Sequence, residues 1–104
     1  MDKESKVVEM VLFKLKEGVT NENAKIALTE LNKFIAHRPG FISRTTSVSE
    51  NNEFLDLVYW TDLKSAVSAS EMAMKDPLAL KSFEVIDEKT MSFEHFLIFN
   101  KKQE

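Results

Sequence analysis

The chain contains no cysteine, and only two glycines and two prolines occur among its 104 residues. Without thiols it can form no disulfide bond, cysteine nucleophile or thiolate metal site. The absence of cysteine fits a reducing compartment. Because glycine and proline are so scarce, the stretches EGVT, HRPGF and DP that contain them mark places where regular elements are expected to end.

The sequence also lacks an excess of positive charge and any long apolar run. Its 14 basic and 17 acidic residues give a formal net charge of −3, so it has no basic surface of the kind that nucleic acid requires. No apolar run approaches the ~18 residues that span a membrane, and the polar start MDKESK has no signal-peptide core. We therefore expect a cytoplasmic protein without nucleic-acid or membrane partners.

The remaining composition is that of one globular domain, residues 1–104, with 43% hydrophobic and 30% charged residues. Runs rich in β-branched and aromatic residues predict strands over residues 6–16, 41–48, 54–60 and 90–100. Apolar residues at i, i+3 and i+4 predict helices over 21–36 and 62–74, with a further helical stretch over 78–87. Thr20 or Asn21 is expected to cap the first helix and Thr61 the second.

The element order β-α-β-β-α-β is the signature of a ferredoxin-like α+β sandwich, in which a four-stranded antiparallel sheet carries its helices on one face. The first strand is apolar on both faces, and Leu55, Leu57 and Tyr59 add to its second apolar face. Leaving that face in water is unfavourable, because each Å² of buried apolar area contributes roughly 25 cal/mol. A homodimer through the open sheet face is the predicted assembly.

Short stretches of the chain resemble known families. VEMVLFKLKEGVT resembles the opening of stress-responsive α/β-barrel (Dabb) proteins, and RPGFISRTTSV and DLVYWTDLKSAVSAS resemble the antibiotic-biosynthesis monooxygenase branch. Both branches lie in the dimeric α+β barrel superfamily, and the resemblance covers nearly the whole chain. It implies a barrel made from two sheets, with a small-molecule pocket between each subunit's own sheet and helices. Activities in the superfamily include cofactor-independent oxygenation, haem degradation and polyketide cyclisation.

Two of these activities lack their residues in this chain. Haem-degrading members carry an Asn in the first strand, a Trp ending the third and a His in the second helix, and of these only Trp60 is present. Cyclase-like members use a His in the first strand and another near the end of the second helix, where this chain has Glu9 and the stretch PLAL. No metal or other cofactor is predicted, because the two histidines lie far apart in the sequence and there is no glycine-rich phosphate loop.

Strand alternation places four notable side chains on the sheet face toward the helices: Glu9, Asp56, Trp60 and His95. The imidazole of His95 suits a general base near neutral pH, and a carboxylate from Asp56 or Glu9 would orient it. These three are the candidate catalytic residues. The alternatives are a structural hydrogen bond for His95, a structural hydrogen bond to a helix terminus or to Arg44 for Asp56, and a solvated place at the sheet rim for Glu9.

The expected ligand pocket is apolar, and the residues expected to line it are Val11, Phe13, Phe34, Val58, Trp60 and Phe93. For Trp60, packing at the strand–helix corner is the alternative to stacking on a substrate. The sequence thus predicts a small-molecule-binding protein and leaves two hypotheses open. One is a cofactor-independent monooxygenase, an oxidoreductase acting on an apolar or aromatic substrate. The other is a non-catalytic ligand-binding or stress-associated homodimer.

Overall fold

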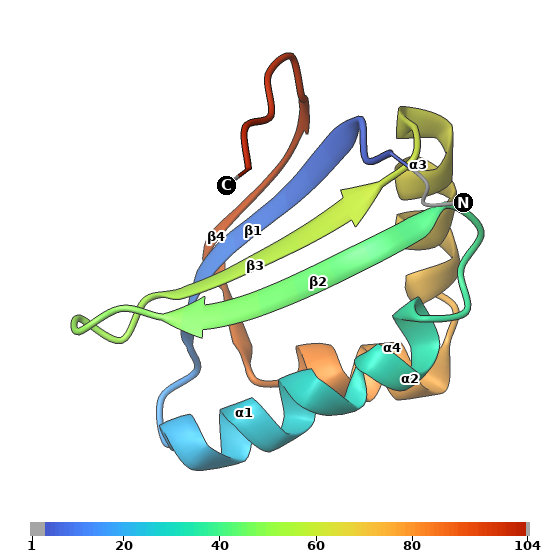
Figure 1. Cartoon of the computed structure of the whole chain (residues 1–104). Coiled ribbons are helices and arrows are strands. Elements are labelled where there is room, and N and C mark those ends of the chain that lie inside the picture. Colours follow the sequence, from blue (N-terminus) through green and yellow to red (C-terminus); the bar gives the residue numbers. More distant parts are fainter. Residues whose placement is uncertain (1–3, 104) are drawn as a thin grey trace.

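The computed structural model describes residues 4–103. Along this range the elements follow in the order β1 (Val7–Leu15), α1 (Asn21–Glu30), α2 (Asn32–Ile35), β2 (Phe41–Val48), β3 (Phe54–Trp60), α3 (Leu63–Ala73), α4 (Pro77–Phe83) and β4 (Ile86–Leu97) (Figure 1). The predicted α+β class and element order are confirmed. The helix predicted over 21–36 consists of two consecutive helices, α1 and α2, whereas the stretches predicted over 62–74 and 78–87 correspond to α3 and α4.

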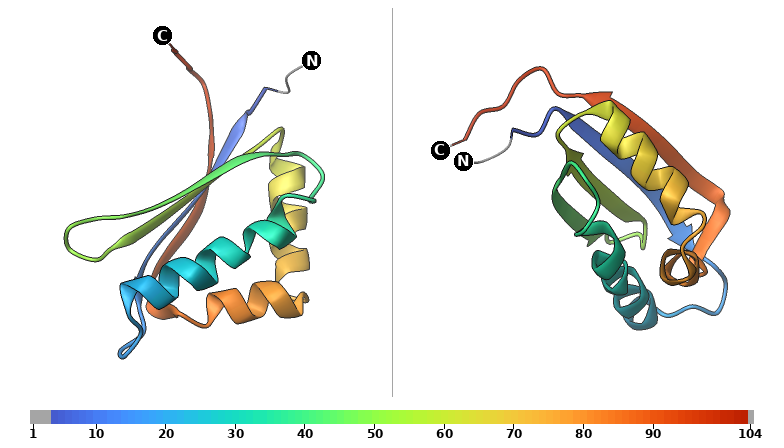
Figure 2. Two further views of the ribbon diagram at one scale, coloured as in Figure 1. Left: turned by 60° about the horizontal axis from the view of Figure 1, so that its bottom comes forward. Right: turned by 90° about the vertical axis from the view of Figure 1, so that its right-hand side faces the viewer.

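The four strands form one antiparallel sheet in the order β2-β3-β1-β4. β1 is central, as expected for a strand that is apolar on both faces. The helices lie on one side of the sheet, as the two views of Figure 2 show, and α3 contacts both β1 and β3. This arrangement is the predicted ferredoxin-like sandwich.

Polar side chains cap three of the helices. Thr20 caps α1, which agrees with the prediction, whereas Asp62 and not Thr61 caps α3, and Asp76 caps α4. Each side-chain oxygen accepts a hydrogen bond from the backbone N–H three residues later, at 3.1, 2.7 and 2.9 Å respectively. These caps satisfy backbone donors that have no partner within the helix, and so fix where each helix begins.

The boundary between the last helix and the last strand differs from the prediction. α4 ends at Phe83, and Ile86 already pairs with Leu15 of β1. Burial explains the difference, because Ile86 is only 6% exposed in the core and pairing with β1 overrides its helical spacing. The register then shifts, so that residues 88–91 form a bulge with no paired residues on β1, and the hydroxyl of Thr90 there accepts a hydrogen bond from the backbone N–H of Lys14. The strand ends at Leu97 and not at residue 100, because Leu97 pairs with the first residue of β1.

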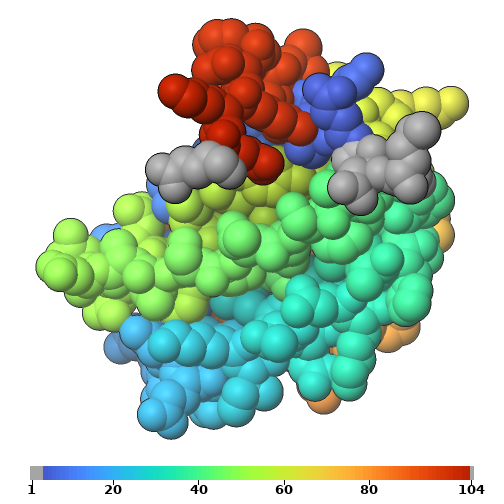
Figure 3. All heavy atoms as spheres, viewed as in Figure 1, coloured from blue at the N-terminus to red at the C-terminus, as the bar shows by residue number. Residues whose placement is uncertain are grey.

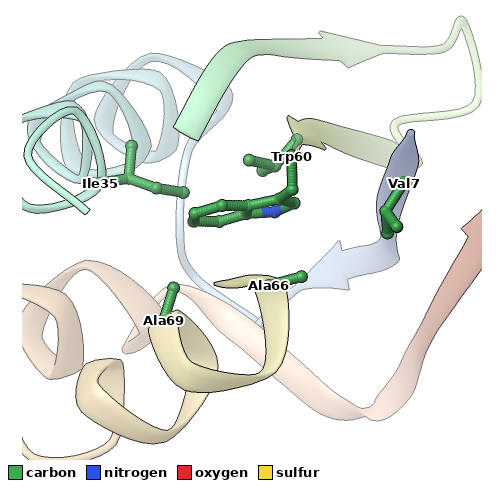
Figure 4. Close-up of a cluster of buried hydrophobic side chains, with 6 residues drawn as sticks. Val7, Ile35, Trp60, Ala66 and Ala69 are labelled. Atoms are coloured by element: carbon green, nitrogen blue, oxygen red, sulfur yellow. The ribbon is translucent and has the colours of Figure 1, made fainter. Parts of the chain in front are cut away.

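Within residues 4–103, three clusters of buried side chains pack between the sheet and the helices, and the smallest consists of Leu31, Ala73 and Ala79. At one end Phe13 stacks on Phe54, with their ring centroids 5.6 Å apart, beside Ala24 and Leu28 of α1. At the other end the indole of Trp60 is fully buried among Val7, Ile35, Ala66 and Ala69 (Figure 4). The small alanines of α3 allow that helix to approach the sheet closely enough to cover the indole.

Among residues 4–103 no helix covers the opposite sheet face. It carries a strip of half-buried apolar side chains: Val8, Met10, Leu12, Leu55, Leu57 and Tyr59. We call these six residues the open-face strip. Phe96, opposite Val8, is 45% exposed. The residues after β4 stand at the top of the molecule in Figure 3, and Phe99 there is 99% exposed. Within residues 4–103 no helix is long and apolar enough to cross a membrane.

Candidate small-molecule site

A cavity of about 470 Å³ lies between the sheet and helices α3 and α4. Its volume is within the range of about 300–1,000 Å³ that is typical of ligand pockets. Most of its wall is apolar and includes Val11, Leu31, Phe34, Val58, Trp60, Ala73, Phe83 and Phe93. Exposed side chains from the turn after β1, from α3 and α4 and from the β4 bulge line its solvent end: Lys16, Glu71, Met74, Glu84, Glu88 and Met91.

Five of the six residues expected in the ligand pocket line this cavity: Val11, Phe34, Val58, Trp60 and Phe93. Phe13 does not, because α1 covers that end of the sheet and holds it against Phe54 in the core. Sequence reasoning missed Leu31 and Phe83, which lie on α-helical faces directed at the cavity. Their helical spacing predicted that both side chains are buried, but it could not show whether a buried side chain packs in the core or lines a cavity.

Glu9 and His95 form a hydrogen-bonded pair on the helix side of the sheet. They lie directly opposite one another on β1 and β4, and 2.9 Å separates Oε1 of Glu9 from Nε2 of His95. Glu9 is only 8% exposed, so a solvated place at the sheet rim is wrong for it. The reason is that β1 is central and α3 packs over it.

Burial governs the electrostatics of this pair. Loss of water around the carboxyl group raises the pKa of Glu9 above its ordinary value, and the hydrogen bond and positive charge of His95 partly oppose that rise. The nearby negative charge of Asp56 raises the pKa further, whereas Arg44 lowers it. Glu9 is therefore a more basic carboxylate than one in water.

His95 does not itself line the cavity, whereas Glu9 does. The imidazole side chain is 21% exposed on the edge strand β4 and lies beside Phe93, with ring centroids 5.2 Å apart. A molecule in the cavity would therefore meet the carboxyl group first, and the imidazole only through it.

Asp56 has a different partner. The guanidinium of Arg44 donates to both of its carboxylate oxygens, with Nε at 2.9 and 3.2 Å and a terminal nitrogen at 2.8 Å. The other terminal nitrogen of Arg44 donates to the backbone carbonyl of Leu28 and to Oδ1 of Asn32, both at 2.8 Å. Asp56 also lines the cavity, but Arg44 and not His95 is its partner. Its geometry is that of a structural ion pair joining β2, β3 and the α1–α2 junction.

The indole of Trp60 contributes to both the core and the cavity wall. It is 0% exposed, and among residues 4–103 its Nε1–H meets no acceptor. Within the same range no group of three or more histidine, aspartate or glutamate side chains is close enough to hold a metal ion. Few buried polar groups line the cavity: the carboxyl groups of Glu9 and Asp56 and the indole N–H of Trp60.

The sheet and its covering helices define a ferredoxin-like α+β fold. No family model and no characterised protein sequence matches the chain. Solved structures match it over nearly its whole length. SnoaB, a cofactor-independent oxygenase from Streptomyces nogalater, has a TM-score of 0.66 and 18% identity over 96% of this chain and 97% of that one.

Two further structures extend this likeness. A proposed antibiotic biosynthesis monooxygenase from Bordetella bronchiseptica has a TM-score of 0.76 and 11% identity, covering 93% of this chain and 100% of that one. A dimeric ferredoxin-like protein of unknown function from Thermobifida fusca has a TM-score of 0.70 and 14% identity, covering 94% of this chain and 95% of that one. Identities this low show a shared fold alone, and the predicted ferredoxin-like fold is confirmed by them.

Proposed function

We propose that this protein is a homodimeric cytoplasmic α+β barrel that binds an apolar or aromatic small molecule and oxygenates it without a cofactor. The observation that carries this proposal is the Glu9–His95 pair, whose buried carboxyl group faces an otherwise apolar cavity. An apolar cavity with one convergent ionisable group is the usual form of a site that binds and acts on a small molecule.

In this proposal Glu9 takes the proton and His95 assists it. Burial raises the pKa of the carboxyl group, and a base with a raised pKa removes a proton from a weak carbon or phenolic acid more readily. His95 holds the carboxyl group in place through Nε2 and, being partly exposed, can pass the proton onward. The sequence hypothesis had these roles reversed, with the imidazole as the base and a carboxylate as its orienter.

The electrons for the reaction come from the substrate. Once a C–H or phenolic O–H proton has been lost, the carbanion adds dioxygen and takes up a proton to give a hydroperoxide. Loss of water from the hydroperoxide leaves a carbonyl group, so one oxygen atom enters the product and the other leaves as water. The protein has only to bind the rings, accept the first proton and keep bulk water away from the carbanion.

A second copy of the chain is proposed to cover the open-face strip. Its six side chains are only half-buried in the single chain, and burying apolar area contributes about 25 cal/mol per Å². Leu57 pairs with Met10 near the centre of this strip. We expect the wild type to sediment as a dimer and Leu57→Lys to sediment as a folded monomer. A dimeric Leu57→Lys variant would place the interface elsewhere.

Oxygen uptake with anthrone tests the catalytic role, because anthrone has an acidic methylene group between two aromatic rings. The wild type should consume one dioxygen per anthrone, and Glu9→Gln should abolish uptake while still binding the compound. Binding is followed by the fluorescence of Trp60, the single tryptophan, which lines the cavity. Glu50→Gln, in the exposed turn between β2 and β3, is the matched control. Unchanged uptake by Glu9→Gln would remove Glu9 from the mechanism.

The second candidate function is ligand binding without catalysis. It is favoured by the position of His95 outside the cavity lining and by the engagement of Asp56 with Arg44, which together leave a single carboxyl group for chemistry. Quenching of Trp60 fluorescence by anthrone with no enzymatic oxygen uptake would support this candidate over the oxygenase.

A further inference from the structure

The solvent end of the cavity is acidic. Glu71 on α3, Glu84 at the end of α4 and Glu88 in the β4 bulge all line it and are exposed. Lys16, after β1, is the one cationic side chain among the lining residues described. The three carboxylates come from three separate segments of the chain, and all of them are lining residues with exposed side chains.

The interior supplies no compensating positive charge. Asp56 is paired with Arg44, whose guanidinium makes five hydrogen bonds to protein acceptors. The imidazole of His95 is already hydrogen-bonded to the carboxyl group of Glu9 and does not itself line the cavity. An anionic group in this cavity would lose its hydration, and Lys16 is the one cationic side chain among the described lining residues that could compensate. Binding an anion there is therefore unfavourable.

The aromatic walls act in the same direction. The side chains of Phe34, Phe83 and Phe93 line the cavity and are at least partly exposed, whereas the lining indole of Trp60 is 0% exposed. The ring of Phe34 already has a cation beside it, because Cζ of Arg38 lies 4.9 Å from the ring centroid. A cation near the face of an aromatic ring is attracted by the ring quadrupole, whereas an anion is repelled. Apolar walls, aromatic faces and an acidic entrance together match an aromatic molecule that carries a positive charge.

We propose that the ligand of this cavity is an aromatic amine, bound with its rings in the interior and its ammonium group at the entrance between Glu71, Glu84 and Glu88. This proposal rests on the proposed function, since it names the substrate class of the same cavity. It predicts a ranking for molecules of one shape: the amine binds most tightly, the neutral analogue less tightly and the carboxylate least tightly.

The test uses three probes built on one naphthalene ring: naphthylmethylamine, naphthylmethanol and naphthoate. Their binding to the full chain is measured by Trp60 fluorescence and by isothermal titration calorimetry. At low ionic strength the amine should bind about fivefold to tenfold more tightly than the carboxylate, as expected for a few exposed charges. The difference should fall to within about twofold at about 0.5 M NaCl, where such charges are screened.

Substitution of the entrance carboxylates assigns the effect to them. The triple variant Glu71→Gln, Glu84→Gln, Glu88→Gln should lose the preference for the amine and still bind naphthylmethanol as the wild type does. Glu84→Gln alone, with an unchanged melting temperature, should lose part of the preference, which keeps the test valid if the triple variant does not fold. Glu50→Gln should retain the full preference.

Two outcomes would overturn the proposal and are distinguishable. If the carboxylate binds as tightly as the amine, or if the triple variant keeps its preference, the entrance carboxylates do not select the ligand, and the proposed function stands without this inference. If none of the three probes binds, the cavity is not a site for aromatic molecules, and both proposals fall together.

Discussion

Two polar pairs lie side by side on the helix face of the sheet and differ in how fully they are engaged. The side chains of Arg44 and Asp56 are 3% and 8% exposed, and the guanidinium makes five hydrogen bonds to Asp56, Leu28 and Asn32. Glu9 and His95 share a single hydrogen bond. Among residues 4–103 the second carboxyl oxygen of Glu9 accepts none.

The difference separates a structural pair from a reactive one. A buried charge whose hydrogen-bonding capacity is filled by protein has nothing left to offer a ligand, and removing its partner is costly. A buried carboxyl group with spare capacity beside a cavity can bind or exchange a proton. Asp56 and Glu9 both line the same cavity, so their positions alone do not distinguish the structural carboxyl group from the reactive one.

The largest effect is expected from Arg44→Met, which leaves the carboxylate of Asp56 buried without its cation. Breaking a buried ion pair in this way costs about 3–5 kcal/mol of folding free energy. Urea denaturation followed by Trp60 fluorescence measures the loss. A loss below about 1 kcal/mol would show that water or another side chain replaces Arg44, and that the pair is not structural.

The double variant Arg44→Met, Asp56→Leu is the control for that measurement. With both charges replaced by apolar side chains, much of the stability lost in Arg44→Met should return, because no unpaired charge remains. If the double variant is as unstable as Arg44→Met, the loss comes from packing or from the bonds to Leu28 and Asn32.

A smaller effect, of the opposite sign, is expected from Glu9→Gln. The pKa of Glu9 is raised in the folded protein above its ordinary value of 4.5, so the folded state binds the proton more tightly than the unfolded state. The stability that Glu9 contributes is complete below pH 4.5 and is lost as the pH rises through the higher folded-state pKa. Glu9→Gln removes that loss and should be more stable than the wild type at neutral pH.

Unfolding free energies of the two proteins measured between about pH 4 and about pH 8 test this expectation. The curves should converge at the acid end and separate as the pH rises, with Glu9→Gln above the wild type. A Glu9→Gln protein that is less stable at neutral pH would mean that the charged pair with His95 stabilises the fold, as the pair of Arg44 and Asp56 does.

The smallest effect on stability is expected from His95→Gln, because the imidazole lies on the edge strand and is partly exposed. Its effect on Glu9 should be clearer. The hydrogen bond and positive charge of His95 lower the pKa of Glu9, so removing the imidazole should raise that pKa further. Carboxyl-carbon NMR titration measures the change, and an unaltered Glu9 pKa would show that the two groups are not coupled in solution.

Strand periodicity was enough to predict which side chains share a face of the sheet. The side-chain period of two places Glu9, Asp56 and His95 on the same side once each strand is recognised. Periodicity could not assign partners, because Arg44 lies opposite Val58 and reaches Asp56 diagonally. Such contacts depend on side-chain length and on the register between strands, which the sequence does not reveal.

The errors of the prediction also have physical causes. The stretch FEVID has helical spacing, but pairing of Ile86 with Leu15 places its end in a strand. Phe13 shares a face with Val11 and was expected in the pocket, yet α1 covers its end of the sheet. In both cases the local sequence was compatible with two outcomes, helix or strand for FEVID and pocket or core for Phe13, and tertiary packing selected one of them.

The most direct test of the central claim, that Glu9 and not Asp56 is the group a ligand meets, is a carboxyl-carbon NMR titration of Glu9 with and without anthrol, a phenolic ligand. The account predicts that Glu9 titrates above its ordinary value of 4.5 in the free protein, and that its resonance and pKa move when the ligand binds while the resonance of Glu50 stays in place. Ligand binding that shifts Asp56 and leaves Glu9 unmoved, or a Glu9 pKa at or below 4.5 in the free protein, would contradict it.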